Sequence, residues 1–79
     1  MEFNAYEAFS VTLGEALNEL ALEAKAHQLS SVGTENEDFN TGYLSAFHRV
    51  ITLVQQQADI FDIGLENIGL DKIKESDLI

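Results

Sequence analysis

Cysteine and proline are absent from this chain of 79 residues. Without cysteine the protein forms neither disulfide bonds nor thiolate metal sites, and this composition fits the cytoplasm, where we expect the protein. The first residues, Met1 to Asn4, have neither the basic nor the apolar segment of a signal peptide. Apolar residues never continue for more than a few positions, so we expect no membrane span.

Basic residues are scarce. Four lysine and arginine side chains stand against fourteen acidic ones, which gives a formal net charge of −10 at pH 7. Binding of nucleic acid or anionic lipid depends on basic side chains that neutralise phosphates, so we expect this surface to repel both. The charge suits a basic protein partner, including mimicry of the phosphates of DNA, and it equally suits plain solubility.

The sequence motifs of common enzymes are missing as well. No serine lies in a Gly-x-Ser-x-Gly turn, and there is no glycine-rich phosphate loop. The carboxylates are spread along polar faces instead of lying in the apolar surroundings that prepare a group for acid–base catalysis. We therefore predict that the protein is not an enzyme and has no catalytic residues and no cofactor.

What the sequence does contain is the pattern of one small all-α domain. The first helix is expected at about residues 5–28, with Asn4 and Glu7 as a variant capping box at its start. Gly14 weakens this helix locally. Apolar residues at three- and four-residue spacings share a face about 100° wide, which we expect to point to the core. They are Tyr6, Phe9, Leu13, Ala16, Leu17, Leu20 and Ala24.

A polar connector at residues 29–38 separates the first helix from a second, expected at about 37–61. Thr34 and Glu37 form a capping-box pattern near its start, and Gly64 is the predicted stop. In the tail, 62–79, we expect a final helical stretch near residues 71–76 and five side chains that pack back onto the helices. They are Ile63, Leu65, Ile68, Leu70 and Ile73.

The segment 43–61 is the most informative part of the chain. Its apolar side chains cover an arc of roughly 200° on a helix, about twice the width that an ordinary surface helix buries. The helix therefore needs neighbours on two sides, with Phe47 and Val54 at the buried centre. We predict an antiparallel helical hairpin that pairs with a second copy into a four-helix bundle. The expected interface residues are Tyr43, Leu44, Phe47, Val50, Ile51, Val54 and Phe61.

The alternative cover for this arc is the tail, which could fold back and close a three-helix monomer. The sequence leaves both arrangements open.

Two polar residues bear on the register of such an assembly. Arg49 is the only lysine or arginine between Lys25 and Lys72 and borders the arc. It is a candidate for a salt bridge to a glutamate of the first helix, from its own chain or from a partner, that sets the register. Gln57 falls inside the arc, where an amide can fix the register of packed helices.

Glu19, Glu23 and His27 recur at every fourth position, so their side chains could converge on a metal ion. The Glu-x-x-His pattern of di-iron bundles and the His-Glu-x-x-His pattern of zinc hydrolases are both missing. We expect no metal, with His27 packed against the apolar face or capping its helix and His48 facing solvent.

The sequence therefore predicts a non-enzymatic, homo-oligomeric protein that acts through protein–protein interaction. The first alternative is an acidic, immunity-type inhibitor that binds a basic enzyme. The second alternative is a metal-dependent enzyme that uses carboxylate and histidine ligands.

Overall fold

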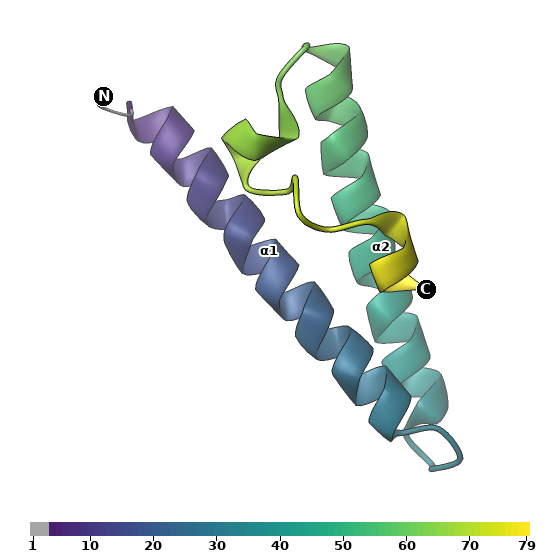
Figure 1. The fold of residues 1–79 in the computed structure, drawn as a ribbon. Coiled ribbons are helices and arrows are strands. Elements are labelled where there is room, and N and C mark those ends of the chain that lie inside the picture. The colour runs from purple at the N-terminus through teal and green to yellow at the C-terminus, as the bar shows by residue number, and fades with distance from the viewer. Residues whose placement is uncertain (1–3) are drawn as a thin grey trace.

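The computed structural model describes residues 4–79, and its regular structure is entirely helical (Figure 1). Two long α-helices, α1 (Ala5–Ser30) and α2 (Glu37–Ile60), form an antiparallel hairpin. Two 3₁₀ turns follow, η1 (Leu65–Ile68) and η2 (Glu75–Leu78), and no strand occurs within the described part of the chain. The predicted all-α helical hairpin is confirmed, while its pairing into a four-helix bundle stays a prediction.

Helix α1 begins at the predicted cap. The Asn4 side chain accepts a hydrogen bond from the backbone N–H of Glu7 at 2.8 Å, and its amide donates to Glu7 Oε1 at 3.0 Å. These bonds satisfy a backbone donor that the first turn would otherwise leave free. The predicted weakness at Gly14 does not break the helix, which continues unbroken to Ser30.

Helix α2 begins at the predicted place but without the predicted cap. Its N-cap is Asn36, whose side chain makes no capping hydrogen bond. The hydroxyl of Thr34 donates instead to the carbonyl oxygen of Ser31 at 2.6 Å, and it accepts from the N–H of Asn36 at 3.3 Å. Thr34 therefore stabilises the turn between the helices and does not cap α2.

The predicted stop at Gly64 is also wrong. The chain leaves α2 at Asp62, which has a φ of 58°, while Gly64 has an ordinary extended conformation with a φ of −64°. The N–H of Ile63 then donates to the carbonyl oxygen of Ala58 at 2.8 Å. This hydrogen bond spans six residues and closes the C-terminus of the helix, as in a Schellman motif. The left-handed residue of this motif is usually glycine, but aspartate can also occupy it.

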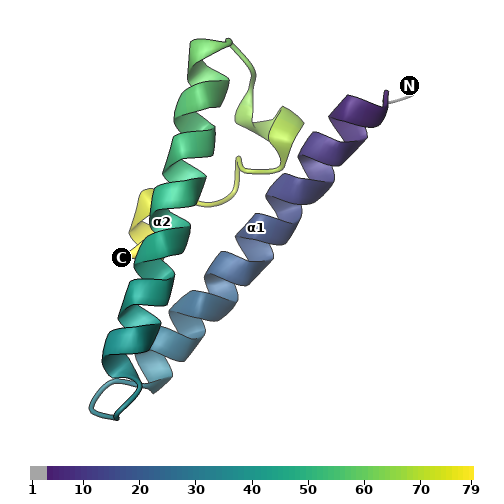
Figure 2. The ribbon, with the colours of Figure 1, turned by 180° about the vertical axis from the view of Figure 1, so that it is seen from behind.

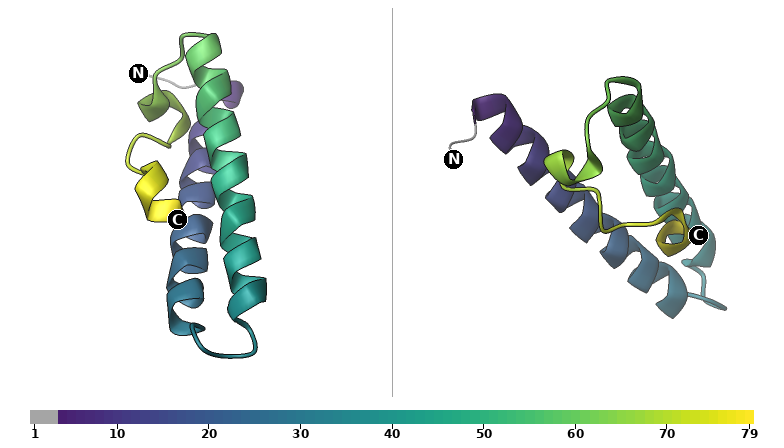
Figure 3. Two further views of the ribbon diagram at one scale, coloured as in Figure 1. Left: turned by 90° about the vertical axis from the view of Figure 1, so that its right-hand side faces the viewer. Right: turned by 45° about the horizontal axis from the view of Figure 1, so that its top comes forward.

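The tail folds back between the two helices and lies along one side of the hairpin (Figure 3). Turn η1 packs on α1, and η2 touches both helices. Leu70 and Ile73 are buried in the core, as predicted, whereas Ile63 stays 43% exposed. The last turn forms at Glu75–Leu78, beyond the predicted stretch. The core cluster consists of Ala21, Ala24, Leu44, Ile51, Leu70, Ile73 and Leu78.

Two glycines bring the backbone of the tail directly onto α1. A Cβ added to Gly14 would overlap the carbonyl oxygen of Ile68. Gly69 has a φ of 71°, and a Cβ there would lie 2.6 Å from the carbonyl oxygen of Val11. Real Cβ atoms do not approach backbone this closely, so both positions need glycine for η1 to dock.

Polar contacts fasten the end of the tail to both helices. Lys25 Nζ donates to the carbonyl oxygen of Ile79 at 2.6 Å, and His48 Nε2 lies 3.1 Å from Glu75 Oε1. The prediction that His48 faces solvent is therefore wrong, because its side chain is partly covered and pairs with the tail. Such a contact depends on how the tail folds back, which the helical pattern of α2 does not reveal.

Candidate functional site: the open face of the hairpin

The tail covers only one side of the hairpin. Seen from behind, α2 passes in front of η2 and the other side of the helix pair carries no further element (Figure 2). On α2, the residues that contact the tail include His48 and Gln55. Ala46 and Leu53 lie roughly 160° around the helix from them, at 100° per residue. The side away from the tail therefore lacks an intrachain partner in the described structure.

Helix α2 presents an apolar stripe on this uncovered side. Its residues alternate at spacings of four and three, which is the pattern of a coiled-coil seam. Phe39 and Ile60 near its ends are 72% and 70% exposed, and Leu53 between them is 43% exposed. The stripe consists of Phe39, Tyr43, Ala46, Val50, Leu53, Gln57 and Ile60.

Helix α1 presents a second stripe on the same side, formed by Phe9, Leu13, Ala16 and Leu20. The prediction that these large side chains point to the core is wrong, since Phe9 is 66% exposed. The buried residues are Gly14, Ala21 and Ala24, so the helix is turned by roughly 70° from the predicted orientation. Small residues face the core because the tail packs closely on α1, which leaves the larger ones on the uncovered side.

Three shallow hollows join the two stripes into one surface, which we call the open face. Their volumes are about 140, 120 and 150 Å³, and each is lined by both helices. The first lies by Leu20 and Tyr43, the second by Leu13 and Val54, and the third by Leu17 and Val50. A shallow apolar surface with several small hollows suits packing against another helical surface better than enclosing a small molecule.

The structure divides the predicted interface residues into three groups. Leu44 and Ile51 are buried in the core of the chain, so they are not available to a partner. Tyr43, Val50 and Phe61 are exposed. Phe47 and Val54 are partly buried at the edge of the core and not at its centre, which corrects their predicted place.

Phe39, Leu53 and Ile60 of the stripe were missed as interface candidates. Each lies three or four residues from the next residue of the stripe, and this spacing was the sequence signal that could have identified them.

Arg49 and Gln57 both lie at this surface. Arg49 is exposed at the outer border of the α2 stripe, and it makes no ion pair with any residue between 4 and 79. Gln57 is exposed within the stripe. The predicted contact between Arg49 and a glutamate of its own α1 is therefore not made. The other form of the prediction, a contact between Arg49 and a glutamate of a partner, stays a prediction.

The metal-site alternative finds no support in side-chain positions. Among residues 4–79, no three His, Asp or Glu side chains gather closely enough to hold a metal ion, so Glu19, Glu23 and His27 do not form a common site. His27 is exposed and lines a hollow of the open face. The prediction that His27 packs against the apolar face or caps its helix is therefore wrong.

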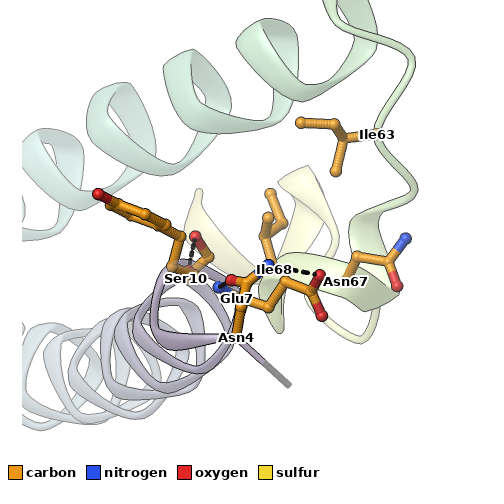
Figure 4. Close-up of a pocket in the computed structure, with 7 residues that line it drawn as sticks. Asn4, Glu7, Ser10, Ile63, Asn67 and Ile68 are labelled. Carbon is orange, nitrogen blue, oxygen red and sulfur yellow. Dashed lines mark hydrogen bonds between the residues drawn. The ribbon is translucent and has the colours of Figure 1, made fainter. Parts of the chain in front are cut away.

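Two larger hollows lie away from the open face. One, of about 440 Å³, lies between the start of α1 and η1, where Asn4, Glu7 and Ser10 already hydrogen bond within α1 (Figure 4). The other, of about 470 Å³, is lined by four acidic residues and four others, and we call it the acidic hollow: Val11, Glu15, Asn18, Glu19, Glu66, Gly69, Asp71 and Lys72. Neither brings together a nucleophile and a base.

No family model, curated protein or solved structure matches the chain. None of the helices in the described region is both long and apolar enough to cross a membrane.

Proposed function

We propose that this is a non-enzymatic interaction protein that pairs with a second copy of itself through the open face, giving a cytoplasmic four-helix bundle. The observation that supports this proposal is the open face itself. Two long helices each expose an apolar stripe on the same side, while the tail closes the opposite side. Exposed apolar surface of this extent is typical of sites that bind other proteins.

The exposed area has the size that a dimer would need. The accessible surface of the chain is 5803 Å², whereas a folded monomer of 8.7 kDa is expected to expose about 4,700 Å². The excess of about 1,100 Å², taken over the whole chain, is large enough to include the roughly 800 Å² that each partner buries in an interface of standard size. Burying it would provide the larger core that a chain of 79 residues cannot form alone.

A second copy suits the open face better than an arbitrary partner does. Alternating spacings of three and four on both helices are the pattern that left-handed helical bundles pack together. The residues of the two stripes are uncharged, and Glu23 and His27 line only the hollow beside Leu20 and Tyr43. Gln57 within the α2 stripe would then fix the register of the pair.

Two matched leucine variants test this proposal. Leu53 lies in the α2 stripe and is 43% exposed, and Leu22 lies on α1 away from the open face and is 49% exposed. Leu53→Asp should raise the dimer dissociation constant at least about 100-fold, because two carboxylates per dimer would be buried without partners. Leu22→Asp, which adds the same charge, should leave it nearly unchanged. Light scattering across a dilution series measures both.

Equal masses for Leu53→Asp, Leu22→Asp and the unsubstituted chain would contradict the proposal. Circular dichroism on the same samples shows whether each variant keeps its helices, so unfolding is not mistaken for dissociation.

A second candidate function is binding of a basic protein, as in an acidic inhibitor. The observation in its favour is the acidic hollow, which is lined by Glu15, Glu19, Glu66 and Asp71 together with one lysine, Lys72. Such binding would weaken as salt is added, because it depends on unscreened charges. Glu15→Gln together with Asp71→Asn should then abolish capture of a basic partner and leave the dimer intact.

A further inference from the structure

We infer that the second copy packs so that α2 of each chain lies over α1 of its partner, with both hairpin loops at the same end and Arg49 beside the partner's Glu19. This inference rests on the proposed pairing through the open face. It adds the arrangement of the two chains and the charged contact that selects it.

Two arrangements bring identical open faces together with two-fold symmetry. An axis parallel to the helices places α2 over the partner's α1 and keeps both loops at one end. An axis across the helices, in the plane of the interface, places α1 over α1 and α2 over α2, with the loops at opposite ends. The apolar stripes can be buried in either case, so the charges at their borders decide.

Those borders carry opposite charges on the two helices. Arg49 lies at the outer border of the α2 stripe, and Glu19 lies at the outer border of the α1 stripe, between the open face and the acidic hollow that it also lines. Arg49 is turned by roughly 70° and Glu19 by roughly 90° from the centre of its stripe at 100° per residue. When α2 lies over the partner's α1, these two borders meet. Both residues are exposed, so their side chains are free to pair.

The two residues also lie at similar heights along the hairpin. Leu17 shares a hollow with Val50, and Leu20 shares one with Tyr43. Counting from these two pairs puts Glu19 level with residue 48 or residue 44, so Arg49 lies one to five residues, or about 1.5–7.5 Å, further along α2, within the reach of its long side chain. Rotation about an axis parallel to the helices leaves the position of each residue along the helices unchanged. Arg49 of each chain therefore lies near the partner's Glu19, and the contact occurs twice in the dimer.

The other arrangement opposes like charges. Between Asp38 and Asp59, helix α2 contains no acidic residue, so α2 over α2 offers Arg49 no central carboxylate. In the same arrangement, α1 over α1 brings the acidic borders together, with Glu19 and Glu23 in both chains. The favoured arrangement does place the acidic loops at one end, but Glu35 and Asp38 there are exposed and salt screens their repulsion.

Charge exchange within one chain tests the arrangement. Arg49→Glu and Glu19→Lys should each raise the dimer dissociation constant roughly tenfold at low salt, because each replaces two ion pairs by two repulsions. The double variant should restore the original value, since it recreates both pairs with their signs reversed. In the other arrangement, the double variant still places like charges opposite each other, so it does not restore the original dissociation constant.

A control separates this contact from net charge. Asp59→Lys changes the net charge of the chain as Glu19→Lys does, but Asp59 is exposed on α2 roughly 150° around the helix from the centre of the stripe. Reducing the negative charge should hold or tighten the dimer in Asp59→Lys. Weakening in Glu19→Lys despite that reduction would support the local contact. Equal behaviour of the two variants would overturn it.

Cross-linking gives an independent measurement, because the natural chain has no cysteine. An Arg49→Cys chain and a Glu19→Cys chain, mixed and mildly oxidised, should form a disulfide mainly between the two different chains. Disulfides mainly between identical chains would overturn the arrangement while leaving the dimer in place. A monomeric mass for the unsubstituted chain would instead overturn the proposed pairing itself.

Discussion

Gly14→Ala should lower the free energy of unfolding by at least about 2 kcal/mol, although alanine is the better helix former by about 1 kcal/mol. The reason is steric: the new methyl group would overlap the backbone carbonyl of Ile68, which cannot rotate away as a side chain would. Turn η1 must therefore lift off α1. Thermal unfolding measures the loss, and faster trypsin cleavage after Lys72 and Lys74 would report release of the tail.

Gly42→Ala is the matched control for this prediction. Gly42 lies in α2, and a Cβ added there meets nothing within 4 Å. The substitution should raise stability by about 0.5–1 kcal/mol through helix propensity alone. If Gly14→Ala also raised stability, the close approach of η1 to α1 would be contradicted.

Leu70→Ala should cost about 2–5 kcal/mol of stability, the range for removing a large buried side chain. Leu70 is fully buried, and it lies in the tail at the point where the tail crosses between the helices. The loss combines the transfer free energy of the missing methyl groups with the cavity that they leave. Urea unfolding at fixed protein concentration measures it.

Leu22→Ala provides the comparison for Leu70→Ala, because it removes the same atoms from a side chain that is 49% exposed. It should cost less than about 1 kcal/mol. Equal losses at the two positions would show that the tail does not complete the core.

The elements that depend on local sequence could be predicted. Periodic apolar residues identified both helices, and the Asn4 cap formed because capping involves only the first turn. Gly14 was misjudged because helix propensity describes an isolated helix, whereas here a glycine is needed for a long-range backbone contact. The end of α2 at Asp62 was misjudged for a related reason, since glycine is only the commonest residue with positive φ.

The candidate site could be predicted in part. The wide arc on α2 predicted two packing surfaces, of which the structure shows one, the core, and the arc itself does not show where one surface ends and the other begins. Treating it as one surface put Phe47 and Val54 at the centre, although they lie at the boundary between the core and the open face. The side taken by the tail decides which residues remain exposed, and that depends on the contacts of Leu70, Ile73 and Leu78 with both helices.

The mass of the unsubstituted protein in solution tests the central claim most directly. Sedimentation equilibrium should give twice the chain mass of 8.7 kDa at tens of micromolar, with dissociation towards the monomer on dilution. A mass of 8.7 kDa throughout that range would contradict the account, because the open face would then remain exposed to water in the folded protein.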